Sequence, residues 1–243
     1  MRFAVVIPTH KRYRFLQVAL ASVQAQTPQD WEGFVVDYEG APRVENIVER
    51  LNDERFRYWR NERQKGPAGA RNTAIFNSDA DWFAFLDDDD EWLPERLARV
   101  SALIEANEDD ELALIYTGWY KFDYERGKPL SRHTPTESGS VSLRMPSFNW
   151  GATSNMVASR ELLLDSPYEF SAAGFDERLG AGEDVDMYLR AATMHHIGII
   201  EEPLLRVRAG GHERITTDKR GRERWTPVHE RYWHLMGANR GDH

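Results

Sequence analysis

The feature that most constrains this chain is an apolar run that ends abruptly in an acidic one. Residues 82–86 are all apolar, and four aspartates, Asp87 to Asp90, follow directly, with Glu91 after them. Five apolar residues in a row are typical of a strand that is buried on both faces. Carboxylates at the mouth of a buried sheet raise one another's pKa and must be neutralised or solvated. The run therefore indicates either a site for a divalent cation with hard oxygen ligands, or an acidic turn that caps the next helix.

Composition narrows the class of protein. The chain has 243 residues and 41% hydrophobic residues, enough to bury a full core, and this length favours one domain. Lys and Arg total 31 against 40 for Asp and Glu, a formal charge of -9, which argues against a nucleic-acid partner. The absence of cysteine excludes disulfides, thiolate zinc sites and cysteine nucleophiles.

The first apolar run, from Phe3 to Ile7, ends at Pro8. It is too short for a signal peptide or for a membrane span. We therefore expect a cytoplasmic protein with no transmembrane segment, for which peripheral association with a membrane is still open.

The first half of the chain repeats a strand, a loop and a helix three times. Strands are predicted at 3–7, 34–37 and 56–60, and helical spacing of apolar residues follows the first two of them. This alternation predicts an α/β fold with a mostly parallel central sheet and helices on both faces. Thr9, Asp37 and the run from Asp87 to Asp89 fall at the carboxyl ends of strands, where ligands bind in such sheets.

The second half has a less regular pattern. We predict a strand at 114–120, hairpins or a mobile loop at 121–145, a short helix at 160–164, a helix opened by Glu183 and Asp184, and a last strand at 197–200. The remainder, from Glu201, is rich in arginine and histidine and is expected to fold back over a site. We divide the chain into a first half, 1–118, and a second half with a C-terminal tail, 119–243, within one continuous domain.

Four motifs in this order give the chain a family resemblance: Val6 to Thr9, Gly66 to Asn72, Phe85 to Pro94 and Gly182 to Asp184. Together they resemble the family 2 glycosyltransferases over nearly the whole length. The resemblance implies a Rossmann-like GT-A fold and a nucleotide-diphosphate sugar as donor. It also implies Mn2+ or Mg2+ as cofactor and, usually, inversion at the anomeric carbon.

The resemblance implies that 1–118 is the donor-binding half and that 119–243 is the acceptor-binding and catalytic-base half. It also assigns roles to particular residues. Asp87 and Asp89 match the Asp-x-Asp motif and would bind the metal, with Asp89 as the first choice, while Asp87 and Asp88 would also contact the substrate. Thr9 would contact the nucleoside, and Asp37 the edge of the base. Glu183 and Asp184 match the segment that supplies the catalytic base, for which we favour Asp184.

The chain departs from the family at one of these places. The family often has two aspartates followed by glycine and serine, whereas this sequence has Asp37-Tyr38-Glu39-Gly40. The identity of the base is therefore open.

Other candidate residues have an ordinary alternative beside the functional one. The remaining expected substrate contacts are His10, Arg12, Glu39, Lys65, Arg71, Trp150, Arg208 and Arg214. Arg71 could instead be a structural partner of the acidic loop, and Trp150 could pack in the core. His212 follows two glycines and could complete the metal site, or could be a surface residue. Glu183 and Asp184 could form an acidic first turn that complements the helix dipole.

The expected function is the metal-dependent inverting transfer of a sugar, most simply from a UDP-sugar, to a hydroxyl group. The acceptor would be a saccharide or a lipid-linked molecule, in polysaccharide, lipopolysaccharide or glycolipid assembly. One rival is a sugar-phosphate nucleotidyltransferase, although the loop from Pro8 to Arg12 lacks the glycines that such enzymes carry there. Another is a catalytically silent carbohydrate-binding protein of the same fold. An EF-hand is excluded because Trp92 stands where its loop requires glycine.

Overall fold

The structure is a computed structural model. It describes residues 1–27, 30–107, 111–135, 153–164, 173–179, 181–210 and 232 of the chain.

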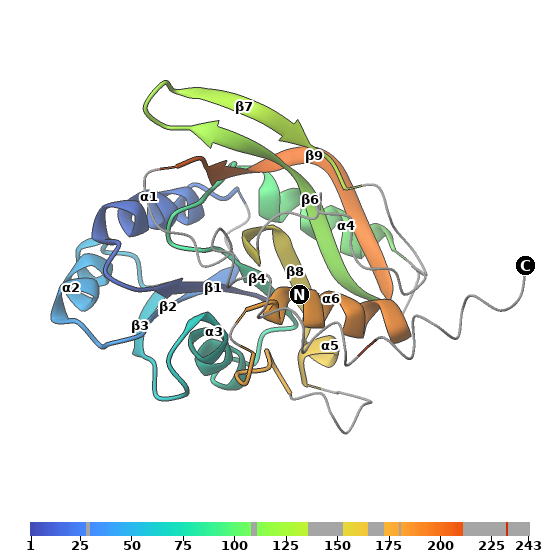
Figure 1. Cartoon of the computed structure of the whole chain (residues 1–243), viewed down its shortest axis with the longest axis horizontal. Helices are drawn as coiled ribbons and strands as arrows, with labels where there is room; N and C mark the ends of the chain where they lie inside the picture. Colours follow the sequence, from blue (N-terminus) through green and yellow to red (C-terminus); the bar gives the residue numbers. More distant parts are fainter. Residues whose placement is uncertain are drawn as a thin grey trace, which may run out of the picture.

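The first half of the chain forms the parallel part of one sheet (Figure 1). Its elements, in order, are β1 (Phe3–Thr9), α1 (Tyr13–Gln24), β2 (Trp31–Asp37), α2 (Pro42–Arg50), β3 (Phe56–Arg60), α3 (Pro67–Phe76) and β4 (Trp82–Phe85). The strands lie in the order β3-β2-β1-β4, and each neighbouring pair is parallel. Parallel neighbours end at one edge of the sheet, so the loops after β1, β2 and β4 lie close together.

The second half extends the same sheet with strands of both directions. Its elements are β5 (Glu91–Trp92), α4 (Arg96–Ala106), β6 (Leu112–Asp123), β7 (Lys128–His133), the short 3-10 helix η2 (Thr153–Asn155), β8 (Met156–Ser159), α5 (Arg160–Leu164), α6 (Glu183–Met194) and β9 (His196–Arg208). The order continues β4-β8-β6-β9-β5, and β7 pairs with β6 as a hairpin. The pair β6 and β9 is parallel, whereas β8 is antiparallel to both of its neighbours.

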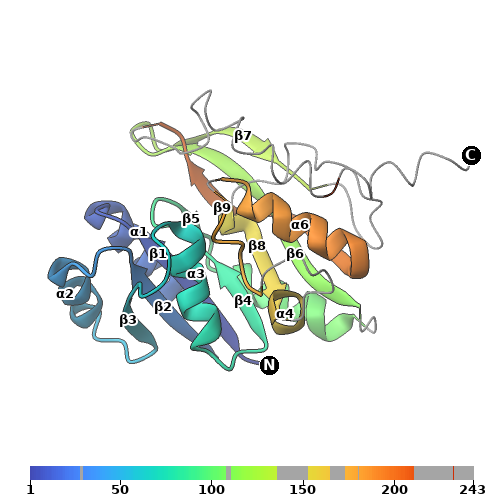
Figure 2. The same ribbon diagram turned by 60° about the horizontal axis from the view of Figure 1, so that its bottom comes forward.

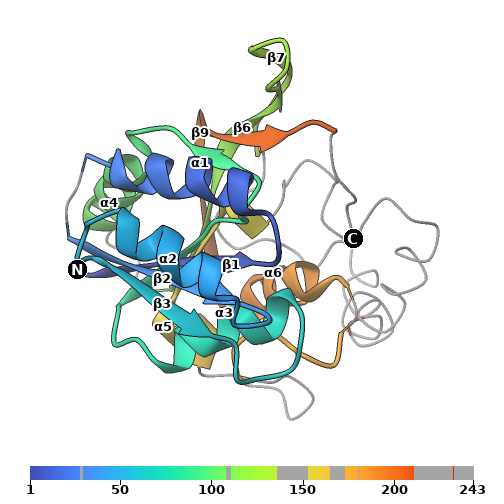
Figure 3. The ribbon, with the colours of Figure 1, turned by 90° about the vertical axis from the view of Figure 1, so that its left-hand side faces the viewer.

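Helices cover both faces of the sheet because its central strands are apolar on both sides. β1 and β4 are buried along their whole length. Alanines of α3 and the apolar side chains of α5 and α6 pack on one face, and α1, α2 and α4 pack on the other. Figure 2 shows α3 and α6 on the first face, and Figure 3 shows the sheet between α1 and α3.

The last strand is much longer than its sequence indicates. Glu201 to Arg208 is not a tail: it continues β9 alongside β6 as far as the pair Phe122 and Arg208. The register shifts between Thr117 and Gly118, and a Cβ on Gly118 would lie 2.6 Å from the carbonyl oxygen of Glu201. Glycine is therefore needed at this close approach of the two strands. Two glutamates and a proline interrupt the apolar pattern here, so the sequence pattern does not indicate that the strand continues.

Part of the predicted hairpin region is confirmed by β7, and residues 136–145 of it lie outside the described ranges. The helix predicted at 160–164 is confirmed with the same bounds. In the described part of the chain, the helices are all too short or too polar to span a membrane.

Candidate active site

Asp88 joins the loop after β4 to the loop after β1. Its carboxylate accepts hydrogen bonds from Thr9 Oγ1 at 2.7 Å and from the backbone N–H of His10 at 3.3 Å. Arg12 Nη1 lies 3.2 Å from the other oxygen. Burial raises the pKa of Asp88 to about 6, although the Thr9 hydrogen bond and the Arg12 charge oppose the shift. The predicted convergence of these two loops is thus observed, with Asp88 as their link.

Arginines from three distant elements neutralise the acidic loop. Arg12 Nη1 lies 3.0 Å from Asp89 Oδ2, and Arg71 Nη2 lies 2.8 Å from Asp87 Oδ1. Arg208, at the end of β9, donates its backbone N–H to Asp90 Oδ1 at 3.0 Å and its Nε–H to the carbonyl oxygen of Asp89 at 3.1 Å. From the sequence we considered a metal or solvent as the counterpart of these carboxylates. We also considered Arg71 as a structural partner of this loop, and its ion pair with Asp87 is observed.

Ser154 fixes the shape of the acidic loop from the opposite side. Its hydroxyl donates to Asp90 Oδ2 at 2.7 Å and accepts the backbone N–H of Asp87 at 3.0 Å, while its carbonyl accepts from Trp92 Nε1 at 3.1 Å. Asp90 is buried, and burial together with the charges of Asp89 and Asp87 raises its pKa to about 8. Asp90 is therefore protonated for most of the neutral range and belongs to the support of the loop.

Arg71 joins the acidic loop to the segment expected to carry the catalytic base. Its Nη1 lies 2.8 Å from Glu183 Oε1, and its Nη2 contacts Asp87 at the same distance. Only 2% of Arg71 is exposed, and its guanidinium stacks over the ring of Phe175 at 5.2 Å. From the sequence, Arg71 was either a substrate contact or a structural partner of the acidic loop. The structure shows the contact with the acidic loop. The same side chain brings Glu183 next to a loop that is almost a hundred residues earlier in the sequence.

Asp184 is the second residue of α6, which begins directly after Gly182, a glycine with the left-handed φ of 84°. Its Oδ1 accepts the backbone N–H of Val185 at 2.9 Å. Burial is the main cause that raises the pKa of Asp184 to about 6; the charge of Glu183 adds to the shift and that of Arg71 opposes it. A carboxyl group with this pKa is mostly ionised at neutral pH and can accept a proton.

The loops after β1 and β2 form a rim at this edge of the sheet, and two stacked aromatic rings join them. Tyr38 stacks on His10 with centroids 5.4 Å apart and planes 12° apart. His10 Nε2 lies 3.2 Å from Glu39 Oε1, and Lys11 Nζ lies 3.1 Å from Glu39 Oε2. Neither Tyr38 nor this stack was expected, because ring contacts between distant loops leave no periodic signal in a sequence.

Asp37 is buried beneath that rim. Its carboxylate accepts the backbone N–H groups of Glu39 and Ala41, which shapes the turn into α2. The expected contact of Asp37 with a nucleotide base stays a prediction.

The remaining candidates are divided between this edge and other regions. Arg208 lies at the acidic loop, where its guanidinium also covers the rings of Tyr124 at 3.6 Å and Phe15 at 4.3 Å. Lys65 is exposed in the loop before α3. Three further candidates lie outside the described residues: Trp150, His212 and Arg214.

The acidic loop offers part of a metal site. Among the described residues, no three His, Asp or Glu side chains are grouped so that they could hold an ion. Asp87 and Asp89 supply two carboxylates from one loop, and Mg2+ is typically bound through one or two carboxylates with substrate phosphates completing its shell. The two residues fit such an ion as the protein's share of its ligands.

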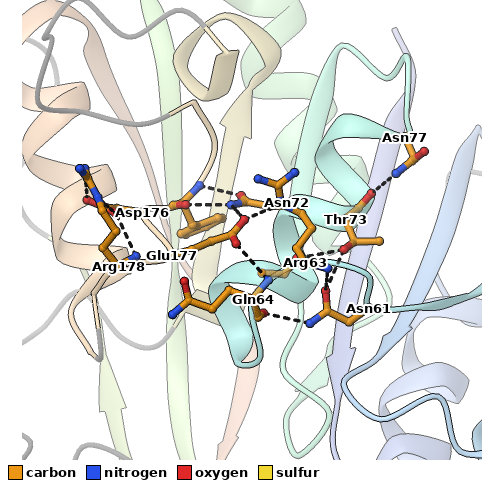
Figure 4. Close-up of polar contacts among 11 residues, drawn as sticks. Asn61, Arg63, Gln64, Asn72, Thr73, Asn77, Asp176, Glu177 and Arg178 are labelled. Carbon is orange, nitrogen blue, oxygen red and sulfur yellow. Dashed lines mark hydrogen bonds and ion pairs between the residues drawn. The ribbon is translucent and has the colours of Figure 1, made fainter.

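A polar cluster on α3 anchors the segment that leads into α6 (Figure 4). Asn72 Nδ2 donates to the carbonyl of Phe175 and to Glu177 Oε1, each at 2.8 Å, and Asn72 Oδ1 accepts the N–H of Phe175 at 2.8 Å. Gly174 has a φ of 75°, and a Cβ there would lie 2.2 Å from Asn72 Oδ1. Arg63 holds the other end of the cluster through Glu177. We did not predict this contact.

Solved structures of low sequence identity share the fold. The TarS protein of S. aureus, in a structure with UDP-GlcNAc, superposes with a TM-score of 0.71 at 18% identity, covering 94% of this chain and 65% of that one. A mannosyltransferase from Pyrobaculum calidifontis, in complex with GDP-Man and Mn2+, gives a TM-score of 0.59 at 18% identity, covering 100% of this chain and 65% of that one. These neighbours confirm the predicted α/β fold of the GT-A type.

Curated relatives resemble the chain over different shares of their length. An uncharacterized glycosyltransferase of Rickettsia conorii is 26% identical over 86% of this chain but only 33% of its own length, so the chain spans about a third of that relative. An uncharacterized glycosyltransferase of Methanocaldococcus jannaschii is 29% identical over 84% of this chain and 70% of its own. A UDP-Glc:alpha-D-GlcNAc-diphosphoundecaprenol beta-1,3-glucosyltransferase of Escherichia coli is 31% identical over 43% of this chain and 42% of its own.

The family model described as Glycosyl transferase family 2 matches residues 4–160, well over half of the chain. That range contains β1 except for Phe3, and the whole acidic loop. Together with the arrangement of the site, this match means that the chain belongs to glycosyl transferase family 2.

Proposed function

We propose that the chain carries out a metal-dependent, inverting transfer of a sugar from a nucleotide-diphosphate donor, with a UDP-sugar as first choice, to the hydroxyl group of a saccharide or lipid-linked acceptor. The observation that carries the proposal is the Arg71 bridge, which brings the acidic loop and the Glu183-Asp184 turn to one edge of the sheet. The relative from Escherichia coli, whose name specifies UDP-Glc and a diphosphoundecaprenol-linked acceptor, supports this choice of substrates. Polysaccharide, lipopolysaccharide or glycolipid assembly is the corresponding setting.

Asp184 acts as the general base in this mechanism. The acceptor oxygen attacks the anomeric carbon while its proton passes to the Asp184 carboxylate. The bond between the anomeric carbon and the diphosphate oxygen breaks, and its electron pair leaves with the diphosphate. Although the pKa of Asp184 is raised to about 6, it still lies below neutral pH, so the group is mostly ionised there and is more basic than an ordinary aspartate.

The acidic loop and its arginines act on the leaving group. A divalent ion at Asp87 and Asp89, when bound, stabilises the negative charge that develops on the diphosphate. Arg12 and Arg208 already border this loop and add positive charge at the same place. Arg71 acts indirectly, because it is buried between Asp87 and Glu183 and fixes the two sides relative to each other.

Calorimetric titration with UDP, GDP, CDP and dTDP, each with and without Mn2+, tests the proposal. We expect Mn2+-dependent binding of UDP to the native chain and its loss in Asp89→Ala. Asp79→Ala is the matched control, because it removes a carboxylate that is 90% exposed and lies after α3 rather than in the acidic loop. If none of the four diphosphates bound, or if Asp89→Ala bound them normally, the proposal would be wrong. Release of pyrophosphate from a nucleoside triphosphate and a sugar phosphate would indicate a nucleotidyltransferase instead.

A further inference from the structure

A groove between α1 and α2 is lined by arginines and lies outside the machinery described above. Its volume is about 370 Å3, and it is lined by Tyr13, Arg14, Gln17, Arg43, Asn46, Ile47 and Arg50. The two helices lie side by side on the face of the sheet that is turned away from α3 and α6 (Figure 3). The lining holds three guanidinium groups and no carboxylate.

The face of α2 that borders the groove is basic because of how the arginines are spaced along the helix. The lining residues of α2 after Arg43 follow it by three, four and seven positions: Asn46, Ile47 and Arg50. This spacing places all four on one face of the helix. Glu45 lies elsewhere on the helix, where its charge acts on Tyr58 of β3. Glu49, the other acidic residue of α2, does not line the groove either, so the groove collects the positive charges of α2 and leaves both negative ones outside.

Two of these arginines, Arg14 and Arg43, are not placed to stabilise their own helices, whereas Arg50 lies in the last turn of α2, where a cation is favourable. Arg14 lies in the first turn of α1 and Arg43 in the first turn of α2. A cation near a helix N-terminus faces the positive end of the helix dipole, which is unfavourable. The first turn of α1 also contains no acidic residue that would compensate.

The arginines of the groove also have no counter-charges of their own. Within the described part of the chain, no ion pair involves Arg14, Arg43 or Arg50. Two arginines that are exposed outside the groove do have partners: Arg57 pairs with Glu32 at 3.5 Å and Arg99 with Glu202 at 3.0 Å. Arg43 is held over the ring of Tyr13 at 4.3 Å, which orients its guanidinium without neutralising it. In a chain with a net charge of -9, such a concentration of unpaired positive charge is an anion site by its chemistry.

We propose that the groove between α1 and α2 binds phosphate groups. Guanidinium groups match phosphate oxygens in geometry and charge. Arg43 and Arg50 are separated by about 10 Å along the helix axis, so the groove suits a ligand that presents more than one phosphate. Such groups could come from the headgroups of an anionic membrane or from a phosphorylated molecule in solution.

Two binding assays, made without divalent metal, distinguish these sources. The first is co-sedimentation with vesicles of phosphatidylcholine, with and without phosphatidylglycerol, and the second is calorimetric titration with inorganic pyrophosphate. Each is made with the native chain, with the double variant R14Q/R43Q and with Arg50→Gln. The matched control is R57Q/R99Q, which removes the same charge from exposed positions outside the groove.

We expect R14Q/R43Q to lose about 25-fold in affinity for the anionic probe that the native chain binds, and R57Q/R99Q to lose far less. Arg50→Gln should lose an intermediate amount, because it leaves the stack of Arg43 on Tyr13 in place. Binding to the phosphatidylglycerol vesicles identifies a membrane surface as the source, and binding to pyrophosphate alone identifies a soluble ligand. The proposal is overturned if the native chain binds neither probe, or if R14Q/R43Q and R57Q/R99Q behave alike.

Discussion

Asp184 is the side chain on which the proposed chemistry depends most directly. It is the carboxylate at the start of α6 whose pKa is raised to about 6, and Glu183 beside it contributes to that shift. Glu183 is itself held by Arg71. The pKa of Asp184 is raised mainly by burial, and the charges of Glu183 and Arg71 adjust it in opposite directions.

The variant Asp184→Asn tests the role of that residue. An amide has nearly the shape of the carboxylate but cannot accept the proton of the acceptor hydroxyl. We expect kcat for sugar transfer to fall about 1,000-fold, with binding of the nucleotide diphosphate unchanged. Glu161→Gln, a change of the same kind in the first turn of α5, serves as control. Unaltered transfer by Asp184→Asn would rule out the assigned base.

The pH profile of kcat follows from the same pKa. Asp184 must be ionised to act, so activity should fall about tenfold for each pH unit below a pKa of about 6 and should level off above it. Because the charge of Glu183 raises this pKa, Glu183→Gln should move the acid limb to lower pH. An acid limb that did not move would mean that another group titrates.

The contribution of Asp90 to stability should depend on pH in the opposite direction from that of a salt-bridged aspartate. Its pKa of about 8 in the folded protein lies well above the ordinary value, so the folded state holds a proton that the unfolded state has released. Stability from this group is present at low pH and is lost as the pH rises through 8. We expect the free energy of unfolding, measured with urea, to decrease between pH 6 and pH 8 by about 2 kcal/mol. The decrease should be absent in Asp90→Asn.

Among the elements, α3 has a second task besides covering the sheet. Through Asn72 it holds the backbone of Phe175, and through that segment it fixes where α6 begins (Figure 4). The donor-side loops after β1 and β2 do not depend on this contact. Loss of the Asn72 contacts should therefore affect the proposed base more than the nucleotide site.

Asn72→Ala tests this separation. It leaves the buried N–H and C=O of Phe175 without their partner, which should destabilise the fold by about 3 kcal/mol. We also expect kcat to fall while the affinity for the nucleotide diphosphate is retained. Asn77→Ala is the control, because Asn77 lies on the loop at the end of α3 and donates only to the carbonyl of Thr73 at 2.8 Å. Equal effects of the two variants would exclude a positioning role for Asn72.

The elements also show which features a sequence can reveal. The buried strands β1 and β4 were predicted because an apolar run has few other structural explanations. The loops that carry Thr9 and the acidic run were predicted to converge because parallel strands end at one edge, and the contact of Thr9 with Asp88 lies there. The neutralising arginines at 12, 71 and 208 were not recognised as a set, because they come from three separate elements and no spacing relates them.

In the molecule as a whole, β9 prevents a simple division into halves. It lies inside the sheet, between β6 and β5, although it comes from the last part of the described chain. The division that we placed at residue 118 falls within β6, which runs from Leu112 to Asp123. The two halves stay a proposal about roles, since their strands form one sheet.

A fragment that ends at Leu164 contains the whole region matched by the family model but lacks β9 and α6. It would expose the edge of β6 and leave buried Arg71 without Glu183. We expect this fragment to aggregate and to lack a cooperative thermal transition, as judged by size-exclusion chromatography and circular dichroism. A monomeric fragment with a sharp transition would show that β9 is dispensable for folding.

The guanidinium of Arg71 also limits which substitutions this sequence can accept during evolution. A change at position 71 alone leaves the carboxylates of Asp87 and Glu183 without their shared partner, and a change at either acid leaves Arg71 with half of its countercharge. Each single step is costly, so the three positions should change together or hardly at all. Among descendants of a common ancestor, residues 71, 87 and 183 should therefore be inherited as a set.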